Sequence, residues 1–162
     1  MRIGMLAVCL AWGFLSYAGT GPPRDTGMFE EAVRLIKRYE GWHGNHLPYI
    51  GYGHRLLPGE RLSSDITEEQ ADSLLREDLR KLCVLFRDFG KDSLLLAALA
   101  YNVGPYRLLG YGELPKSRLI RRLESGDRDI YDEYVSFRCY RGKVVPSIER
   151  RRKEEFRLLF VP

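Results

Sequence analysis

The sequence lacks an apolar run long enough to cross a membrane. An uncharged, mostly apolar run covers Ile3–Leu15, which is shorter than the ~18 residues expected of a spanning helix. Arg2 precedes the run, and Ser16-Tyr17-Ala18 places small residues at the two positions that a signal peptidase reads. We therefore predict a signal peptide over residues 1–18, a secreted or periplasmic location, and no stable membrane anchor after cleavage.

Cysteine is scarce as well. The chain has three cysteines, and Cys9 lies within the predicted signal peptide. The other two, Cys83 and Cys139, could pair in an oxidising compartment. Cys83 also lies within a long helical pattern, where a small buried thiol is equally ordinary, so both alternatives stay open. The three histidines stand near glycines, but no cysteine or acid completes a closely spaced ligand set for zinc. We predict no metal and no cofactor.

The sequence contains no internal repeat and no sign of a second domain. Residues 19–27 form a linker that contains glycine and proline and lacks periodicity. Residues 28–162 then have the size of one ordinary domain. The formal net charge is +4 and falls by one when Arg2 is removed. Such a mild basic excess suits an anionic polymer and is also within the normal range. We expect a monomer and no nucleic-acid partner.

Apolar periodicity predicts a mainly helical domain. The first predicted helix ends at Glu40, and a capping box at Thr67–Gln70 opens the second, which continues to about Asp88. Residues 93–103 are apolar nearly all round, which predicts a helix buried on every side. Further helices are predicted around residues 118–124, 128–137 and 146–160. Convincing β signals occur only between residues 41 and 62, which indicates one small hairpin.

Glu40 is the residue whose position points most directly to chemistry. It ends the first helix, because Gly41 takes the left-handed cap conformation without steric cost. A helix C-terminus carries partial negative charge, and Tyr39 and Trp42 flank the side chain, so this carboxyl group is expected to hold its proton tightly. A carboxyl group that is protonated near neutral pH is what a general acid needs. Judged from position alone, the alternative is an ordinary solvated charge at a helix end.

Glu40-Gly41, followed by Ile50-Gly51-Tyr52-Gly53-His54, resembles the catalytic signature of phage-type lysozymes, the endolysin muramidases of glycoside hydrolase family 24. Three further blocks fit in the same order. They are residues 100–104 (AYNVG), residues 117–126 (SRLIRRLESG), and Arg151-Arg152 with Glu155. The resemblance covers roughly Phe29 to Phe160. It implies an α+β, lysozyme-like fold, mainly helical, with one small β-hairpin lobe flanking a substrate cleft, and bacterial peptidoglycan as substrate.

The resemblance also assigns roles to single residues. Glu40 matches the general acid, which protonates the glycosidic oxygen as the bond breaks. Asn102 matches an amide that faces the cleft, although it could instead cap its helix before Gly104. Arg151 matches the first arginine of a pair that lies close to the catalytic glutamate, where a cation would favour the ionised form of the Glu40 carboxyl group and oppose the effect of the helix end. We expect Arg152 to be solvated. His54 is assigned to substrate binding, with a hydrogen-bonding scaffold for the hairpin as the alternative.

The sequence departs from the family at the second catalytic position. The family usually places an aspartate inside a longer hairpin, followed by a threonine, but here Tyr49 stands at the threonine position and no acid occurs between Gly41 and Gly59. The local groups that could activate or position the attacking water are His43, Asn45, His46 and Tyr49. We favour His46, because a neutral imidazole accepts a proton more readily than a phenol, with Tyr49 lining the site. Glu60 or Asp65 could instead fold back towards Glu40.

Three functions remain open from the sequence. The leading one is a muramidase that cleaves the β-1,4 bond between N-acetylmuramic acid and N-acetylglucosamine. A lytic transglycosylase also needs an acid glutamate but no activated water, so the missing aspartate makes it credible. The third is a wall-binding module that kept the fold and lost turnover.

Overall fold

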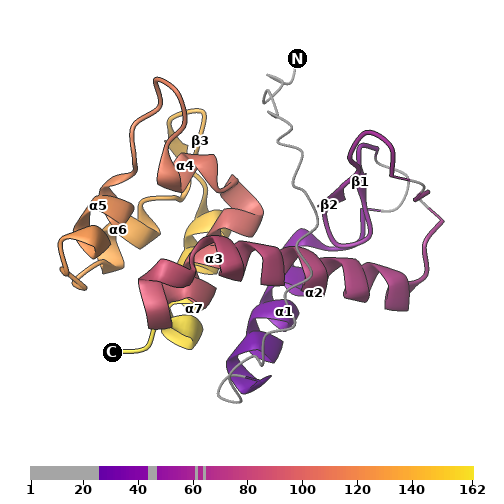
Figure 1. The fold of residues 1–162 in the computed structure, drawn as a ribbon, viewed down its shortest axis with the longest axis horizontal. Helices are drawn as coiled ribbons and strands as arrows, with labels where there is room; N and C mark the ends of the chain where they lie inside the picture. The colour runs from indigo at the N-terminus through magenta and orange to yellow at the C-terminus, as the bar shows by residue number, and fades with distance from the viewer. Residues whose placement is uncertain (1–25, 44–46, 61, 64) are drawn as a thin grey trace.

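The computed structural model describes residues 26–43, 47–60, 62–63 and 65–162. Within them the chain is mainly helical (Figure 1). The helices are α1 (Thr26–Glu40), α2 (Glu68–Leu85), η1 (Arg87–Asp92, a 3₁₀ helix), α3 (Ser93–Val103), α4 (Tyr106–Leu109), α5 (Arg118–Glu124), α6 (Tyr131–Val135) and α7 (Pro146–Leu159). The predicted signal peptide, residues 19–25 of the predicted linker, and His46 lie outside the described residues.

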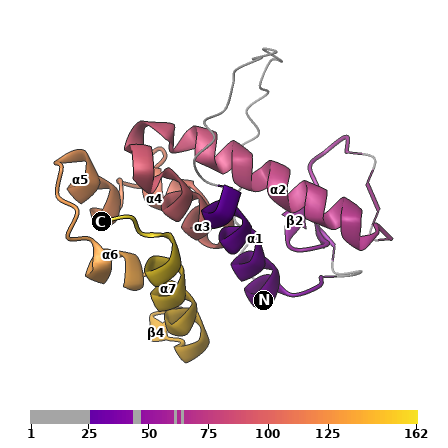
Figure 2. The ribbon, with the colours of Figure 1, turned by 90° about the horizontal axis from the view of Figure 1, so that it is seen from below.

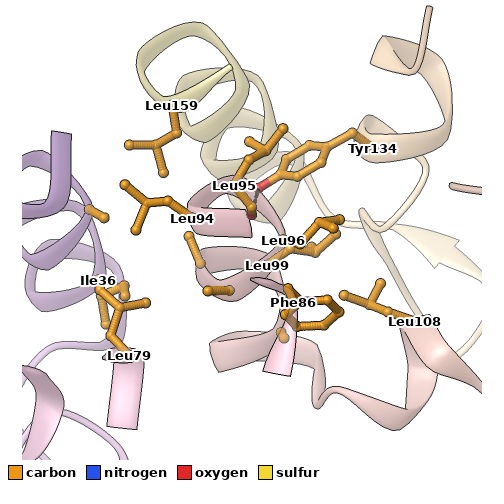
Figure 3. Close-up of a cluster of buried hydrophobic side chains, with 14 of the residues drawn as sticks. Ile36, Leu79, Phe86, Leu94, Leu95, Leu96, Leu99, Leu108, Tyr134 and Leu159 are labelled. Atoms are coloured by element: carbon orange, nitrogen blue, oxygen red, sulfur yellow. Dashed lines mark hydrogen bonds between the residues drawn. The ribbon is translucent and has the colours of Figure 1, made fainter. Parts of the chain in front are cut away.

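Helix α3 is the centre of the fold. Every residue from Leu94 to Ala100 is buried, so this helix has no polar face, as its composition predicts. It packs against α1, α2 and α7. Figure 3 shows its leucines between Ile36 and Leu79 on one side and Tyr134 and Leu108 on the other. The prediction of a helix over residues 93–103 is confirmed, and its burial on every side holds from Leu94 to Ala100, whereas Asn102 near its end is exposed.

Helix α1 is amphipathic and carries Glu40 at its last position. Ala32, Val33, Leu35 and Ile36 are buried against the core. The helix ends as predicted, because Gly41 has a φ of 67° and its N–H bonds to the carbonyl of Lys37 at 3.0 Å. It begins at Thr26, inside the segment that we predicted as linker.

The first hairpin, β1 (Tyr49–Ile50) and β2 (His54–Arg55), docks onto α2. The strands are antiparallel, with Tyr49 opposite Arg55 and Ile50 opposite His54. Ile50 is fully buried and forms a small separate cluster with Ile66 and Ala71. Figures 1 and 2 both place this hairpin beside the N-terminal part of α2, with α5 and α6 at the opposite end of the molecule.

Three features differ from the prediction. A second antiparallel hairpin, β3 (Cys139–Tyr140) and β4 (Lys143–Val144), precedes α7. All four of its strand residues are exposed, so no alternation of buried and exposed positions marks it in the sequence. The helix predicted over 128–137 is limited to Tyr131–Val135, and α2 ends at Leu85 rather than near Asp88.

Two further observations concern the predictions about membranes and disulfides. Within the described part of the chain, no helix is both long and apolar enough to cross a membrane. Cys83 and Cys139 are both free thiols. Burial raises the pKa of Cys83 to about 11, while Cys139 is exposed on β3.

Candidate active site

Helices α1, α3 and α7 bring three side chains together at the C-terminal end of α1. The Oε1 atom of Glu40 accepts hydrogen bonds from Arg151 Nη1 at 2.7 Å and from Asn102 Nδ2 at 3.2 Å. The Glu40 side chain is 17% exposed, whereas that of Arg151 is only 5% exposed. The structure thus joins Glu40, Asn102 and Arg151, three of the residues singled out from the sequence.

Arg151 is charged despite its burial. Burial opposes the charged form, but the carboxylates of Glu155 and Glu40 raise the pKa of the Arg151 guanidinium above its ordinary value. Its Nε donates to Glu155 Oε1 at 2.7 Å, and the guanidinium lies over the ring of Tyr39, 5.5 Å from the centroid. Because these contacts fix the Arg151 side chain, its position against Glu40 is fixed as well.

His43 lies on the other side of the Glu40 carboxyl group. Its Nε2 is 3.9 Å from Glu40 Oε2, a distance that makes an ion pair when the ring is protonated. Its backbone N–H bonds to the carbonyl of Gly51 at 2.8 Å, which ties the segment after α1 to the hairpin. Tyr49 stands next to it, with the two ring centroids 6.0 Å apart. The sequence favours His46 over His43 as the group that receives the water proton, but His46 lies outside the described residues.

Gly53 and Tyr101 complete the surroundings of Glu40. A Cβ atom at Gly53 would lie 3.8 Å from Glu40 Cγ and 3.7 Å from both His43 Nε2 and Tyr101 Cε1. The hairpin backbone therefore passes close to the carboxyl group. Tyr101 donates to the carbonyl of Tyr52 at 3.1 Å, and burial raises the pKa of the Tyr101 hydroxyl well above its ordinary range. Tyr101 thus acts as a neutral donor, a role that the sequence did not suggest.

His54 is held away from this group by two carboxylates. Its Nδ1 lies 2.6 Å from Asp78 Oδ2 and its Nε2 lies 3.2 Å from Glu60 Oε2, and the side chain is 7% exposed. Both ring nitrogens are engaged within the protein, and they join the hairpin to α2. We therefore treat His54 as a scaffold residue, the alternative that its sequence context also allowed.

The contacts of Glu60 also bear on the missing second carboxylate. Besides His54, its Oε2 accepts the Leu57 N–H at 2.8 Å. Burial acts against ionisation, but this N–H and the neighbouring imidazole keep the pKa of Glu60 below its ordinary value. Glu60 is therefore an ionised part of the hairpin scaffold, and Asp65 is exposed.

The expectation that Arg152 is solvated was wrong. Its side chain is completely buried, and Nη2 donates to Asn102 Oδ1 at 2.5 Å while Nη1 donates to Glu155 Oε2 at 2.6 Å. Tyr134 also donates to Glu155 Oε2, at 3.0 Å. The spacing of 151, 152 and 155 along α7 could have indicated such contacts, because residues three and four apart are neighbours on a helix.

A hollow elsewhere on the molecule is lined by none of these residues. It has a volume of about 400 Å³ and is lined by Arg118, Arg121, Arg122, Ser125 and Glu133 of α5 and α6. Among the described residues, no group of three or more His, Cys, Asp or Glu side chains is arranged to hold a metal ion.

The fold and the contacts of Glu40 agree with a comparison against protein families. The family model for phage lysozyme matches residues 31–155. This chain belongs to the phage lysozyme family. The match runs from α1 to α7 and so contains Glu40, Asn102 and Arg151. The resemblance identified from the short sequence blocks is confirmed.

Two individual proteins extend the comparison. The endolysin of Bacillus phage B103 is 30% identical over 158 residues. The match covers 82% of this chain and 53% of the endolysin. The chain thus spans about half the length of this curated relative. An endolysin structure from Escherichia coli O157:H7 phage FAHEc1 matches with a TM-score of 0.60 and 21% identity, covering 80% of this chain and 90% of that one. At this identity the structural match establishes the lysozyme-like fold.

Proposed function

We propose that this protein is a peptidoglycan muramidase that cleaves the β-1,4 bond between N-acetylmuramic acid and N-acetylglucosamine, with Glu40 as the general acid. The observation that carries the proposal is the arrangement of Glu40 at the end of α1. One carboxyl oxygen is held by Arg151 and Asn102, and the side chain remains partly exposed. Family membership supports the same role for this residue.

In the first step, protonated Glu40 gives its proton to the glycosidic oxygen while the bond from that oxygen to the sugar C1 breaks. The departing sugar then leaves as a neutral alcohol, and positive charge develops on the remaining ring. The carboxylate left on Glu40 stays fixed by Arg151 Nη1 and Asn102 Nδ2. Water adds to C1 and loses a proton, which completes hydrolysis.

His43 stands on the same side of the sugar as Glu40. A base on the far face needs room for the sugar and the water, and in inverting enzymes the two catalytic carboxyl groups lie about 6.5–9.5 Å apart. The 3.9 Å between His43 Nε2 and Glu40 Oε2 leaves no such room. We assign His43 the return of a proton to Glu40 after bond cleavage, and keep His46 as the candidate for receiving the water proton, with Tyr49 lining the site.

A lytic transglycosylase is the second candidate, and the commitment of Glu60 to the hairpin favours it. Glu60 and Asp65 are the two acids that could have placed a base on the far face of the sugar. Glu60 is bound to His54 and the Leu57 N–H instead. In this reaction the 6-hydroxyl of N-acetylmuramic acid attacks C1 in place of water, and its proton passes to the Glu40 carboxylate. The products then carry 1,6-anhydro ends.

Exposed aromatic rings supply surfaces for sugar stacking. Trp42 is 49% exposed and packs edge-on against Tyr52, with ring centroids 5.4 Å apart. Tyr106 and Tyr111 form a second exposed pair with centroids 5.1 Å apart. Sugar rings bind well to such partly exposed aromatic side chains, which offer a large apolar face. We propose that the chain acts as a monomer on the cell wall, in a secreted or periplasmic setting.

The direct test replaces Glu40 with glutamine. Glu40→Gln keeps the size of the side chain and its hydrogen bonds but has no proton to donate, so clearing of purified peptidoglycan should slow by about 10²- to 10⁴-fold. Glu31→Gln is the matched control, because Glu31 lies on the same helix, is well exposed and pairs only locally with Arg34. It should clear walls at the wild-type rate.

The outcomes separate the candidate functions. Circular dichroism must show that both variants are folded. If Glu40→Gln clears walls as fast as wild type, Glu40 is not the general acid. If wild type clears nothing but sediments with the walls, the protein is a wall-binding module.

A further inference from the structure

A buried charged network on α7 lies behind the contacts of Glu40. Arg152 is completely buried, and the Glu155 side chain is 1% exposed. Glu155 accepts from both arginines and from Tyr134, whose hydroxyl also points at the carbonyl of Leu95 on α3 (Figure 3). Desolvation of such a network costs free energy, and well-packed apolar residues often stabilise a core as well or better. Stability alone therefore gives no reason for this arrangement.

The network has two arms that end on one atom. In the first arm, Glu155 fixes Arg151, and Arg151 Nη1 donates to Glu40 Oε1. In the second arm, Glu155 fixes Arg152, whose Nη2 donates to the side-chain oxygen of Asn102, and Asn102 Nδ2 donates to the same Oε1. Both arms thus place a donor on Oε1, and Oε2 faces His43.

Arg152 determines which way the Asn102 amide points. A guanidinium has only donors, whereas the amide of asparagine has a donor end and an acceptor end. With Oδ1 turned to Arg152, the NH₂ group must face Glu40. If the amide were rotated by half a turn, Oδ1 would face Glu40 Oε1 and could accept a hydrogen bond from a proton on that oxygen. The orientation imposed by Arg152 therefore makes Oε1 an acceptor only.

We propose that Arg152 and Asn102 are positioning residues that keep the transferable proton of Glu40 on Oε2, the oxygen that faces His43. Arg151 and Asn102 both point N–H groups at Oε1, so a proton on Oε1 would face two other hydrogens. The proton of the Glu40 carboxyl group therefore resides on Oε2. This inference rests on the proposed role of Glu40 as general acid. It assigns Arg152 an effect on catalysis that passes through Asn102, although Arg152 itself contacts neither Glu40 nor substrate.

A double-mutant cycle tests the chain of contacts. Asn102→Ala removes the donor, and Arg152→Lys keeps the buried charge but lacks the planar fork that reaches both Glu155 and Asn102. On solubilised peptidoglycan strands, each single variant should lower kcat by about three- to tenfold, the effect of losing one hydrogen bond, with KM unchanged. In the Asn102→Ala background, Arg152→Lys should lower kcat no further.

Thermal unfolding separates positioning from a structural role. Arg152→Lys should still lower stability in the Asn102→Ala background, because its contact with Glu155 is weakened there too, while its effect on kcat disappears in that background. If the two effects on kcat multiply, Arg152 does not act through Asn102 and the inference is overturned. If Glu40→Gln retains wild-type activity, the proposed function fails whatever the cycle shows.

A second variant keeps the inference testable if Arg152→Lys does not fold. Asn102 is exposed, so Asn102→Asp should fold, and its carboxylate can still accept from Arg152. It would set a second acid against Glu40 Oε1, which draws the proton away from Oε2. We expect kcat at the optimum to fall about tenfold or more, and the alkaline limb of the pH–kcat profile to move up by about one pH unit or more.

The charged and titratable groups that face Glu40 in the described structure are His43 after α1, Tyr101 on α3 and Arg151 on α7. All three are unchanged in the Asn102→Asp variant. A shift in the alkaline limb of its pH–kcat profile is therefore caused by the new carboxylate. Glu154→Gln is the control, since the Glu154 carboxylate on α7 bonds to Tyr39 and Arg38 of α1. A pH–kcat profile for Asn102→Asp that matches wild type would overturn the inference.

Discussion

Arg151 and Asn102 both donate to one oxygen of Glu40, and Arg152 donates in turn to the side-chain oxygen of Asn102. Glu40 stands out as a candidate in the sequence because its evidence is local: the last position of a helix, a glycine cap and a neighbouring motif. Arg152 is harder to assign, because its partner Glu155 lies three residues on in α7 but its contact with Asn102 forms only when α3 and α7 pack together. Three arginines in a row are typical of a solvated stretch, and nothing in their spacing to Asn102 indicates that two of them, Arg151 and Arg152, are buried.

The contacts of His54 with Asp78 and Glu60 predict that the stability of the protein depends on pH. The hydrogen bond to Asp78 raises the pKa of His54; burial opposes this rise, and Glu60 adds to it. A raised folded-state pKa means that the stabilisation is fully present below the unfolded value of about 6.5 and is lost as pH rises through the folded value. The free energy of unfolding should therefore decrease between pH 6 and pH 9.

Urea denaturation at several pH values checks this direction. His54→Gln should be less stable than wild type at pH 6, by about 3–5 kcal/mol if the loss resembles that of one partner from a buried ion pair. The difference between the two proteins should shrink as pH rises, because wild type loses the charged form. A constant difference from pH 6 to pH 9 would show that the charge on His54 does not stabilise the hairpin.

At the scale of elements, the sequence determines the long helices better than the short ones. The capping box at Thr67 and Gln70 is present as predicted, with both reciprocal bonds formed. By contrast, β3 and β4 have two residues each and bury none of them, so the hydrophobic pattern contains no trace of the hairpin. Its turn is marked only by Arg141 and Gly142, both with positive φ.

The docking of the first hairpin on α2 depends on Gly51. A Cβ atom there would lie 2.6 Å from the Cβ of Ala71 and 3.1 Å from Ile66 Cδ1, and φ is 54°. Gly51→Ala should therefore combine left-handed backbone strain of roughly 1–2 kcal/mol with overpacking of roughly 1–3 kcal/mol. Because Gly51 also bonds to His43, wall clearing should fall along with stability.

Gly59→Ala is the matched control for this prediction. Gly59 also has a positive φ, of 90°, but a Cβ atom there would meet nothing within 4 Å. Gly59→Ala should lose only the stability that left-handed backbone strain costs, and it should clear walls at the wild-type rate. Thermal unfolding followed by circular dichroism measures both variants. Equal losses of stability would mean that contact with Ala71 does not limit the hairpin.

At the scale of the whole molecule, the architecture follows from one apolar helix and the elements that cover it. Helices α1, α2 and α7 pack against α3. Of these, α1 brings Glu40 and α7 brings Arg151 to Asn102, which lies near the C-terminal end of α3. The prediction of a mainly helical domain with a small hairpin lobe succeeded because this pattern is strong in the sequence. The identity of the group that receives the water proton stayed open, because the sequence has no acid between Gly41 and Gly59 and His46 lies outside the described residues.

The products released from purified peptidoglycan test the proposed function most directly. Mass spectrometry of the soluble muropeptides, from wild type and from Glu40→Gln, identifies both the bond cleaved and the fate of its C1 carbon. A muramidase with Glu40 as general acid yields N-acetylmuramic acid at reducing ends, and the Glu40→Gln variant yields almost none of these products. Ends in the 1,6-anhydro form would instead establish transglycosylation, and reducing N-acetylglucosamine ends would contradict the assigned bond.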